Sequence, residues 1–192
     1  VLTTFYTSST QPVSTSGNYY LNVFQTGSLV DGSAVQFAIS YADRQGSGSS
    51  AYNSAVVGKS PSSTVYGQYR NLVLGDEESS FSFGGVTSDY FYVISIDRDR
   101  FKESLLPATF NLKIKNGSNI LNLTDNSTNT ATISYNDAGR VYQVVSGSNG
   151  AAYTGLNSNG YSLASGSYGY FLPDVGIILL NGRALDSNAA GG

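Results

Sequence analysis

The amino-acid sequence predicts a mainly β fold, either an antiparallel β-sandwich or a partly open barrel with one short helix and long Gly/Ser loops. Three observations lead to this prediction. The chain of 192 residues contains 15 Tyr and 9 Phe, and aromatic residues pack well on a pleated surface. Charged residues make up only 12 %, while Ser, Thr, Asn and Gly fill much of the remainder. Short alternating runs separated by turn signals favour a sandwich or barrel over an α/β fold.

The first part of the chain predicts an extended arm followed by a pair of strands. We expect residues 1–17 to form an N-terminal arm or an edge strand, because a Pro and several small polar residues interrupt strand character there. Residues 18–25 regain strand character. The dipeptide Asp31-Gly32 is a turn signal before a second alternating run, residues 35–41. Two neighbouring strands joined in this way predict an antiparallel pair.

One helix is predicted between residues 62 and 74. Hydroxyl groups at positions 62–64 are candidates for its N-cap. A strand is the alternative interpretation, because Gly67 weakens a helix by about 1 kcal/mol relative to Ala. Residues 43–63 before it are mostly small and polar and predict a long surface loop. The helix prediction depends on five apolar residues at helical spacing, Val65, Tyr66, Tyr69, Leu72 and Val73.

The rest of the chain predicts further short strands. The run 90–96 is apolar enough to be buried on both faces, and Asn116-Gly117 is a strong hairpin signal. Residues 97–106 alternate acidic and basic side chains and predict one or two exposed helical turns. Residues 147–167 predict a second Gly/Ser-rich loop. The predicted strands after the helix are 79–83, 90–96, 108–115, 120–123, 130–135, 140–146 and 175–180.

These elements predict a single β-rich domain over residues 18–182, with a possible subdivision near 104–108. Residues 183–192 predict a flexible tail. Because the chain begins with Val1 and not with Met, we expect it to be part of a longer protein.

Composition argues against several classes of function. The chain has no Cys and no His, so neither a zinc site nor a Ser-His-Asp or cysteine nucleophile is expected. A net charge of −3 gives no overall attraction for phosphate backbones, so we expect no nucleic-acid partner. No apolar run reaches the roughly 18–20 residues of a membrane-spanning helix, and we expect no membrane partner. We also expect no cofactor, and composition leaves only carboxylates, Lys and Tyr for proton transfer.

Two groups of residues are candidates for a binding surface. The charged run that contains Arg98 and Arg100 could contact a neighbouring subunit or lie in a solvated turn, whereas its two Asp are too few ligands for calcium. The Tyr-rich loop could pack in the core, stack on sugars or form a protein interface. The candidate interface residues are Tyr6, Arg98, Arg100, Tyr153, Tyr161, Tyr168 and Tyr170.

Carboxylates in two loops offer weaker alternatives. Residues 76–78 could supply a glycosidase carboxylate, although that chemistry needs two groups from separate segments that face each other across a cleft. Asp125 lies in a polar loop that resembles a sparse calcium loop but lacks the spaced acidic residues of an EF-hand. The alternative for both is a solvated structural loop.

Several segments together resemble a known family. They cover nearly the whole chain in the same order, and they are residues 2–10, 16–20, 35–41, 66–72, 92–94 with Arg98 and 100–103, 144–147 and 170–181. These segments resemble virion structural proteins of T4-like contractile-tailed phages that infect cyanobacteria. Two departures stand out. The family tends to place a small Trp-containing turn after its basic helix, whereas this chain has Leu105-Leu106-Pro107, and the loop at 43–63 also diverges.

The resemblance implies a structural part of the phage particle, in the tail or baseplate, and not an enzyme. It implies other virion proteins as partners, in a ring or wedge around a symmetry axis, and a location in the virion after assembly in the host cytoplasm. Two alternatives stay open. One is a carbohydrate-binding or host-adhesion β-sandwich that uses the Tyr-rich loop, and the other is a carboxylate-based glycosidase.

Overall fold

The structure is a computed structural model, and it describes residues 20–25, 34–47, 61–129, 133–153 and 168–186. Four predictions lie wholly or mostly outside these ranges. They concern the arm at 1–17, the turn at Asp31-Gly32, the greater part of the two Gly/Ser loops, and the end of the tail.

Twelve strands, two α-helices and one 3₁₀ helix form in the described ranges. Each predicted strand that falls on described residues overlaps an observed one. The elements in chain order are β1 (Tyr20–Phe24), β2 (Val35–Asp43), α1 (Pro61–Leu74), β3 (Phe81–Phe83), β4 (Val86–Ser88), β5 (Tyr90–Ile96), the 3₁₀ helix η1 (Arg98–Arg100), β6 (Asn111–Asn116), β7 (Asn119–Asp125), β8 (Ser134–Asn136), β9 (Gly139–Ser148), β10 (Ala151–Ala152), β11 (Gly169–Leu172), β12 (Ile177–Asn181) and α2 (Gly182–Leu185).

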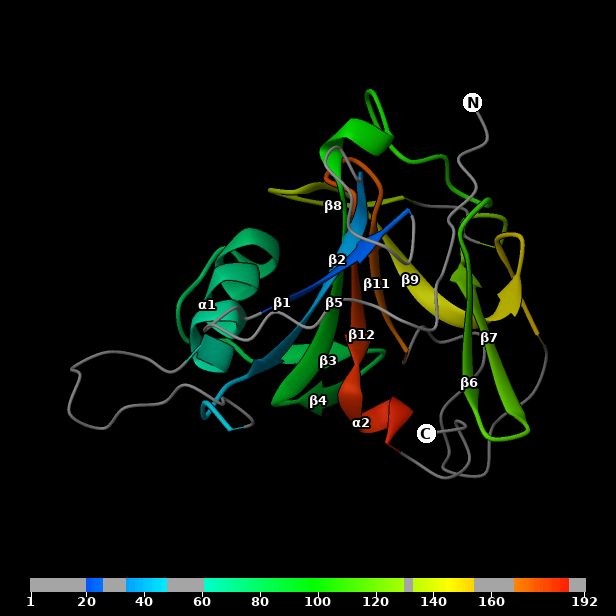
Figure 1. Cartoon of the computed structure of the whole chain (residues 1–192). Coiled ribbons are helices and arrows are strands. Elements are labelled where there is room, and N and C mark those ends of the chain that lie inside the picture. The colour runs from blue at the N-terminus through cyan, green and yellow to red at the C-terminus, as the bar shows by residue number, and fades with distance from the viewer. Residues whose placement is uncertain (1–19, 26–33, 48–60, 130–132, 154–167, 187–192) are drawn as a thin grey trace.

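Ten strands form one antiparallel sheet that curls into a half-barrel (Figure 1). Its order is β1-β2-β5-β12-β11-β9-β7-β6, and β8 and β10 pair with the two ends of β9. Strands β3 and β4 form a separate hairpin. The predicted mainly antiparallel β fold is therefore confirmed.

The centre of the sheet is buried on both faces. All five residues of β12 are buried, and the four apolar ones alternate between two apolar clusters. Ile177 and Leu179 point to the face that α1 covers, whereas Ile178 and Leu180 point to the concave face. A continuous apolar run is the sequence pattern of a strand in this position, and it explains why β5 and β12 were predicted correctly.

The helix-side core lies between the sheet and a cover made by α1 and the β3–β4 hairpin. Phe81 packs edge to face on Phe91, with 4.6 Å between the ring centroids, and stacks on Phe83. The buried hydroxyl of Tyr66 accepts a hydrogen bond from the backbone N–H of Phe81, at 3.2 Å. This core consists of Ala42, Val65, Tyr66, Val73, Phe81, Phe83, Phe91, Val93, Ala138, Leu172, Ile177 and Leu179.

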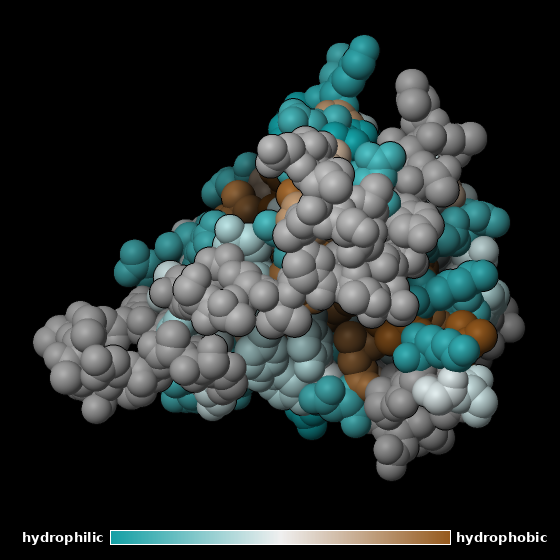
Figure 2. All heavy atoms as spheres, viewed as in Figure 1, coloured by the Kyte–Doolittle hydropathy of each residue, from teal (hydrophilic) through white to brown (hydrophobic). Residues whose placement is uncertain are grey.

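The inner core fills the concave side of the half-barrel. Because the sheet curls, strands that are far apart in its order contribute to one cluster, and Phe110 stacks on Phe171 at 5.1 Å between ring centroids. Figure 2 shows hydrophobic residues at the surface between β12 and the β6–β7 hairpin. This core consists of Ile94, Leu121, Leu123, Tyr142, Val144, Tyr168, Phe171, Ile178, Leu180 and Ala184.

The predicted helix is confirmed, but it begins at Pro61. Proline suits the first helical position because the N–H that it lacks would have no partner within the helix. Positions 62–64 therefore lie inside the first turn, and the prediction that they cap the helix is wrong. Ser62 is buried, and its hydroxyl donates to the carbonyl of Ser47 at 2.8 Å.

Two elements were missed at the C-terminal end. Strand β11 begins at Gly169, whose φ is 146° and whose backbone passes so close to β12 that a Cβ would lie 1.8 Å from the Leu179 carbonyl oxygen. Helix α2 follows β12 directly and buries Ala184. The domain therefore continues past residue 182, and the prediction of a flexible tail is wrong for residues 183–186.

The segment after β5 is less helical than predicted. Of residues 97–106, only Arg98–Arg100 form a 3₁₀ turn. The chain then crosses to β6, and hydrogen bonds fix both sides of the crossing: Leu105 N–H donates to the Pro173 carbonyl, and Ala108 N–H donates to the Asp125 carboxylate. Because β5 and β6 belong to the same sheet, this crossing lies within one structural unit.

Replacing a residue at the centre of the sheet tests this account of the core. Leu179→Ala, at a side chain that is 0 % exposed, should lower the free energy of unfolding by about 2–5 kcal/mol. Leu106→Ala makes the same chemical change at a side chain that is 68 % exposed, and it should change stability by less than about 0.5 kcal/mol. Urea denaturation measures both. Equal losses in the two variants would contradict the assignment of β12 to the centre.

Candidate functional site

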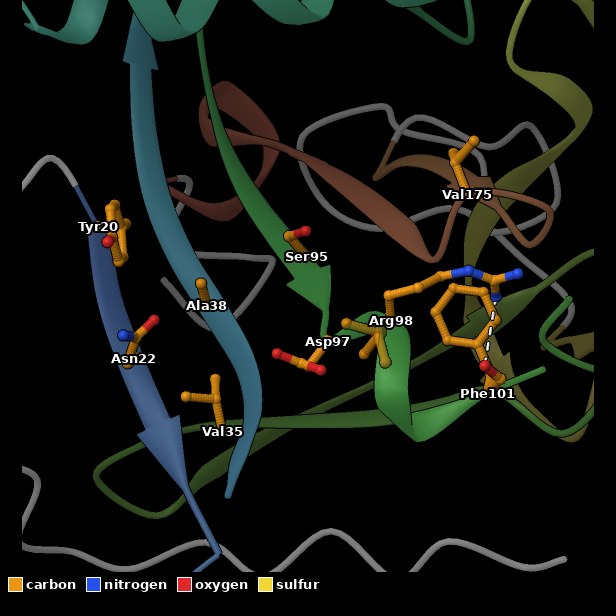
Figure 3. A pocket seen from close by; sticks show the side chains of 10 residues that line it. Tyr20, Asn22, Val35, Ala38, Ser95, Asp97, Arg98, Phe101 and Val175 are labelled. Carbon is orange, nitrogen blue, oxygen red and sulfur yellow. Dashed lines mark hydrogen bonds between the residues drawn. The ribbon is translucent and has the colours of Figure 1, made fainter. Parts of the chain in front are cut away.

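A shallow groove of about 420 Å³ lies on the helix side of the sheet, between the end strand β1 and η1 (Figure 3). Its floor includes the small side chains of Ala38 and Ser95, which come from adjacent strands β2 and β5. Tyr20 of β1 lies at one side, and Arg98 and Phe101 lie at the other. The groove exists because α1 covers only part of this face.

Arg98 is held in place by an aromatic ring. Its guanidinium carbon lies 4.5 Å from the centroid of the Phe101 ring, and Nη1 donates to the Phe101 carbonyl at 3.3 Å. The ring also packs against Gly176, where a Cβ would come within 2.5 Å of a ring carbon. Phe101 is therefore fixed from one side and supports the guanidinium on the other, an interaction worth about 0.5–1 kcal/mol at an exposed site.

The short helix that carries Arg98 has a carboxylate cap. Asp97 is the N-cap of η1, and its Oδ1 accepts from Asp99 N–H at 3.0 Å. Asp97 also lines the groove, so the groove contains one carboxylate beside one guanidinium. The Nε of Arg100 is buried, and it has no hydrogen-bond partner within the described ranges.

A partly buried ion pair connects the segments that wall the groove. Arg140 of β9 donates from Nε and Nη2 to Asp174 Oδ1, at 3.0 Å and 2.5 Å, and from Nη2 to Ser104 Oγ at 2.9 Å. The hydrogen bonds from Arg140 hold the pKa of the Asp174 carboxyl below its usual range. The brace ties the β11–β12 turn to the segment after η1, and it therefore fixes the position of Phe101 relative to Val175.

The Tyr-rich loop does not form one surface in the described residues. Tyr153 is 47 % exposed, whereas Tyr168 is 1 % exposed and lies in the inner core. Tyr170 packs against Phe83 at 5.1 Å between ring centroids, its hydroxyl donates to the Ser82 carbonyl, and burial raises its pKa. Tyr168 is therefore a core residue, and its prediction as an exposed interface residue is wrong. The candidates Tyr6 and Tyr161 lie outside the described residues.

The carboxylates of Asp76 and Asp125 accept hydrogen bonds from backbone N–H groups. Asp76 Oδ1 accepts from the N–H groups of Glu78 and Ser79, and the hydrogen bonds with Ser79 lower its pKa. Asp125 is buried, and its oxygens accept from the N–H groups of Ala108 and Ser127. The hydrogen bond to Asp125 holds the backbone of Ala108, whose φ is 68°. The loop that resembled a calcium site is therefore a structural turn.

A cluster of tyrosines on the concave face was not predicted. Tyr41 lies 5.4 Å from Tyr92 and 6.3 Å from Tyr90 between ring centroids, and the Tyr90 hydroxyl donates to Asp186 Oδ2 at 2.6 Å. Burial, followed by the Asp43 carboxylate, raises the pKa of Tyr41 to about 12. These hydroxyls stay protonated at neutral pH. The Tyr41 hydroxyl donates to Asp43 Oδ2 of its own strand at 3.3 Å, and the bond from Tyr90 to Asp186 ties the end of α2 to the sheet. Only the register of β2 against β5 brings them together, and the sequence does not state that register.

Within the described ranges, no group of three or more Asp, Glu, His or Cys side chains is placed to hold a metal ion. No helix in that part of the chain is both long enough and apolar enough to cross a membrane.

No protein-family model, curated protein or solved structure matches the chain. Function is therefore inferred from the chemistry of the exposed surfaces and from the sequence resemblance.

The brace beside the groove makes stability depend on pH. Because the folded-state pKa of Asp174 is lowered, its contribution is fully present above the unfolded value of about 3.9 and is lost as the pH falls through the folded pKa. Asp174→Asn should therefore be less stable than the wild type at pH 7, and the difference should shrink below about pH 4. Thermal unfolding across this pH range measures both effects.

Asp89→Asn is the matched control for that experiment. Asp89 pairs with Arg44 at 3.7 Å, with both side chains more exposed than those of Arg140 and Asp174. Its replacement should change stability by less than about 0.5 kcal/mol at any pH. A loss in Asp174→Asn that is the same at pH 3 and pH 7 would argue against the brace.

Proposed function

We propose that the chain is a structural component of a phage virion, in the tail or baseplate, which acts through contacts with neighbouring virion proteins and not by catalysis. The observation that carries this proposal is the groove, where Arg98, supported by Phe101, lies across from Tyr20. Tyr and Arg are enriched among the residues that dominate the binding energy of protein interfaces.

The groove has the properties of a protein-contact surface. It is shallow and open, and its one guanidinium and one carboxylate give it little net charge. Its floor belongs to the paired strands β2 and β5, and the Arg140–Asp174 brace holds its wall. A preformed surface loses little conformational freedom when a partner binds, so more of the contact energy appears as affinity.

The sequence resemblance supports the same function. The segments that resemble the phage family contain Tyr20, Ala38, Arg98, Phe101 and Val175. The groove is thus made largely of residues from the segments that carry the resemblance, although these are far apart in the sequence. Tail and baseplate proteins of contractile phages surround a symmetry axis, and a lateral groove suits contact with a neighbour in a ring or wedge.

Removing the supported guanidinium tests the proposal. For Arg98→Ala or Tyr20→Ala in place of the wild-type chain, the affinity for neighbouring proteins should fall at least roughly tenfold, as expected for the loss of an interface residue worth more than about 1.4 kcal/mol. Fewer copies of either variant should therefore be found per particle. Quantitative mass spectrometry of purified particles measures the copy number, and thermal unfolding confirms that the variants fold.

Two matched variants serve as controls. Lys102→Ala removes a positive charge from an exposed position next to the groove, and Tyr135→Ala removes an aromatic ring that is 69 % exposed on β8. Both should be incorporated like the wild type. Normal incorporation of Arg98→Ala, or absence of the wild-type chain from purified particles, would contradict the proposal. Glycan-array binding that depends on Tyr153 would instead favour the carbohydrate-binding alternative.

A further inference from the structure

The sheet has a second exposed feature at the end opposite β1. Among the described residues, β6 pairs only with β7 (Figure 1). Its outer edge therefore presents backbone N–H and C=O groups along the six residues Asn111–Asn116. Such an edge can accept another strand, with main-chain hydrogen bonds that supply affinity and alternate side chains that supply specificity.

From Asn111 to Lys115 the side chains of β6 alternate between the two faces of the sheet. Leu112 and Ile114 pack against the inner core, whereas Lys113 and Lys115 are exposed on the outer face. The two ion pairs found within the described ranges are Arg44–Asp89 and Arg140–Asp174, and neither includes these lysines. The outer face of β6 is thus a short positive stripe on a chain whose net charge is −3.

An exposed apolar residue lies beside this stripe. Ile120 of β7 is directly opposite Lys115 in the ladder, and its side chain is 58 % exposed. Edge lysines alone can simply prevent unwanted strand pairing. A large exposed aliphatic side chain next to them does not serve that purpose, because it offers apolar area that a partner can bury.

The hairpin is also held rigidly. Its two-residue turn is Gly117-Ser118, and Gly117 adopts a φ of 59°, which glycine tolerates without strain. At the other end of β6, the Asn111 side chain donates to Asn149 Oδ1 and accepts from Asn149 N–H, each at 2.9 Å. The edge is therefore fixed before any partner arrives.

The charge pattern selects among possible occupants. If two copies paired antiparallel through β6, the lysines of one copy would face those of the other, and like charges in directly opposite positions destabilise a sheet. A strand with acidic side chains at alternate positions would instead place a carboxylate opposite each lysine. Directly opposite side chains lie about 4.5–5.5 Å apart between Cβ atoms, which is within reach of an ion pair.

We propose that β6 is the acceptor edge for strand addition by an extended segment of a neighbouring virion protein. This segment carries acidic residues at alternate positions, facing Lys113 and Lys115, and apolar residues at the positions between them, beside Leu112 and Ile114. The inference rests on the proposed function, because it names the chemistry of a partner within the assembly. It concerns a different surface from the groove, so the two can be tested separately.

A synthetic peptide of alternating Glu and Val tests the edge directly. It should bind the full chain in a fluorescence-anisotropy titration at low salt, and it should slow hydrogen exchange of the outward-facing amides of β6. The double variant Lys113→Glu/Lys115→Glu should bind it roughly tenfold more weakly and should bind a Lys-Val peptide instead. Lys102→Glu, which changes one exposed charge elsewhere, should bind the Glu-Val peptide like the wild type.

Three results would overturn the inference. The first is no binding of the Glu-Val peptide, and the second is equal binding to the double variant and the wild type. The third is protection of the β6 amides through concentration-dependent self-association, which would identify a second copy as the occupant. None of these results would change the outcome for Arg98→Ala in particles, so a failure here differs from a failure of the proposed function.

Discussion

The burial of β12 on both faces is the constraint on which the rest of the structure depends. A strand with apolar side chains on both sides needs other residues to cover it on both faces of the sheet. One helix of 14 residues and a hairpin of two three-residue strands cover only part of one face of a ten-stranded sheet. The other face is covered because the sheet curls, so that β7 and β9 bring Leu121, Leu123 and Val144 into one cluster with Ile178 and Leu180. The half-barrel is thus the consequence of having too little helix for so apolar a sheet.

The same shortage of cover explains where the groove lies. Helix α1 packs over the part of the sheet where large side chains, such as Phe91 and Leu179, need burial. Toward the other ends of β2 and β5 the helix-side residues become Ala38 and Ser95, which leave little apolar area exposed. That region can stay open to solvent without a large cost, and it is walled by η1 and by the braced turn before β12. The groove and the core therefore follow from one pattern of residue sizes along the strands.

Local pattern predicted the elements well, and contacts between distant elements explain what it missed. A few neighbouring residues are enough to determine three of the elements: the strand at 90–96, the helix and the hairpin predicted from Asn116-Gly117. The two residues of that hairpin turn are Gly117-Ser118. Strand β11 is different, because Gly169 is explained only by its close approach to Leu179. The sequence marks Arg98 as part of a charged run. Its contact with Phe101 and its position across the groove from Tyr20 depend on the tertiary fold, which the local sequence does not show. Tyr168 and Tyr170 looked alike in sequence and differ because one faces the inner core.

The two proposed contact surfaces lie at the two ends of one continuous sheet. The groove involves β1, β2 and β5, whereas the lysine edge is β6, the last strand at the opposite end. Two unlike surfaces on one rigid body are what a heterologous arrangement requires, in which each subunit uses one surface toward one neighbour and the other toward the next. An isologous pair through β6 would place Lys113 and Lys115 against the same residues of the second copy, and their repulsion disfavours it. The charge on this edge thus opposes the self-pairing that would close the assembly at two copies, and it leaves the edge open to a different strand.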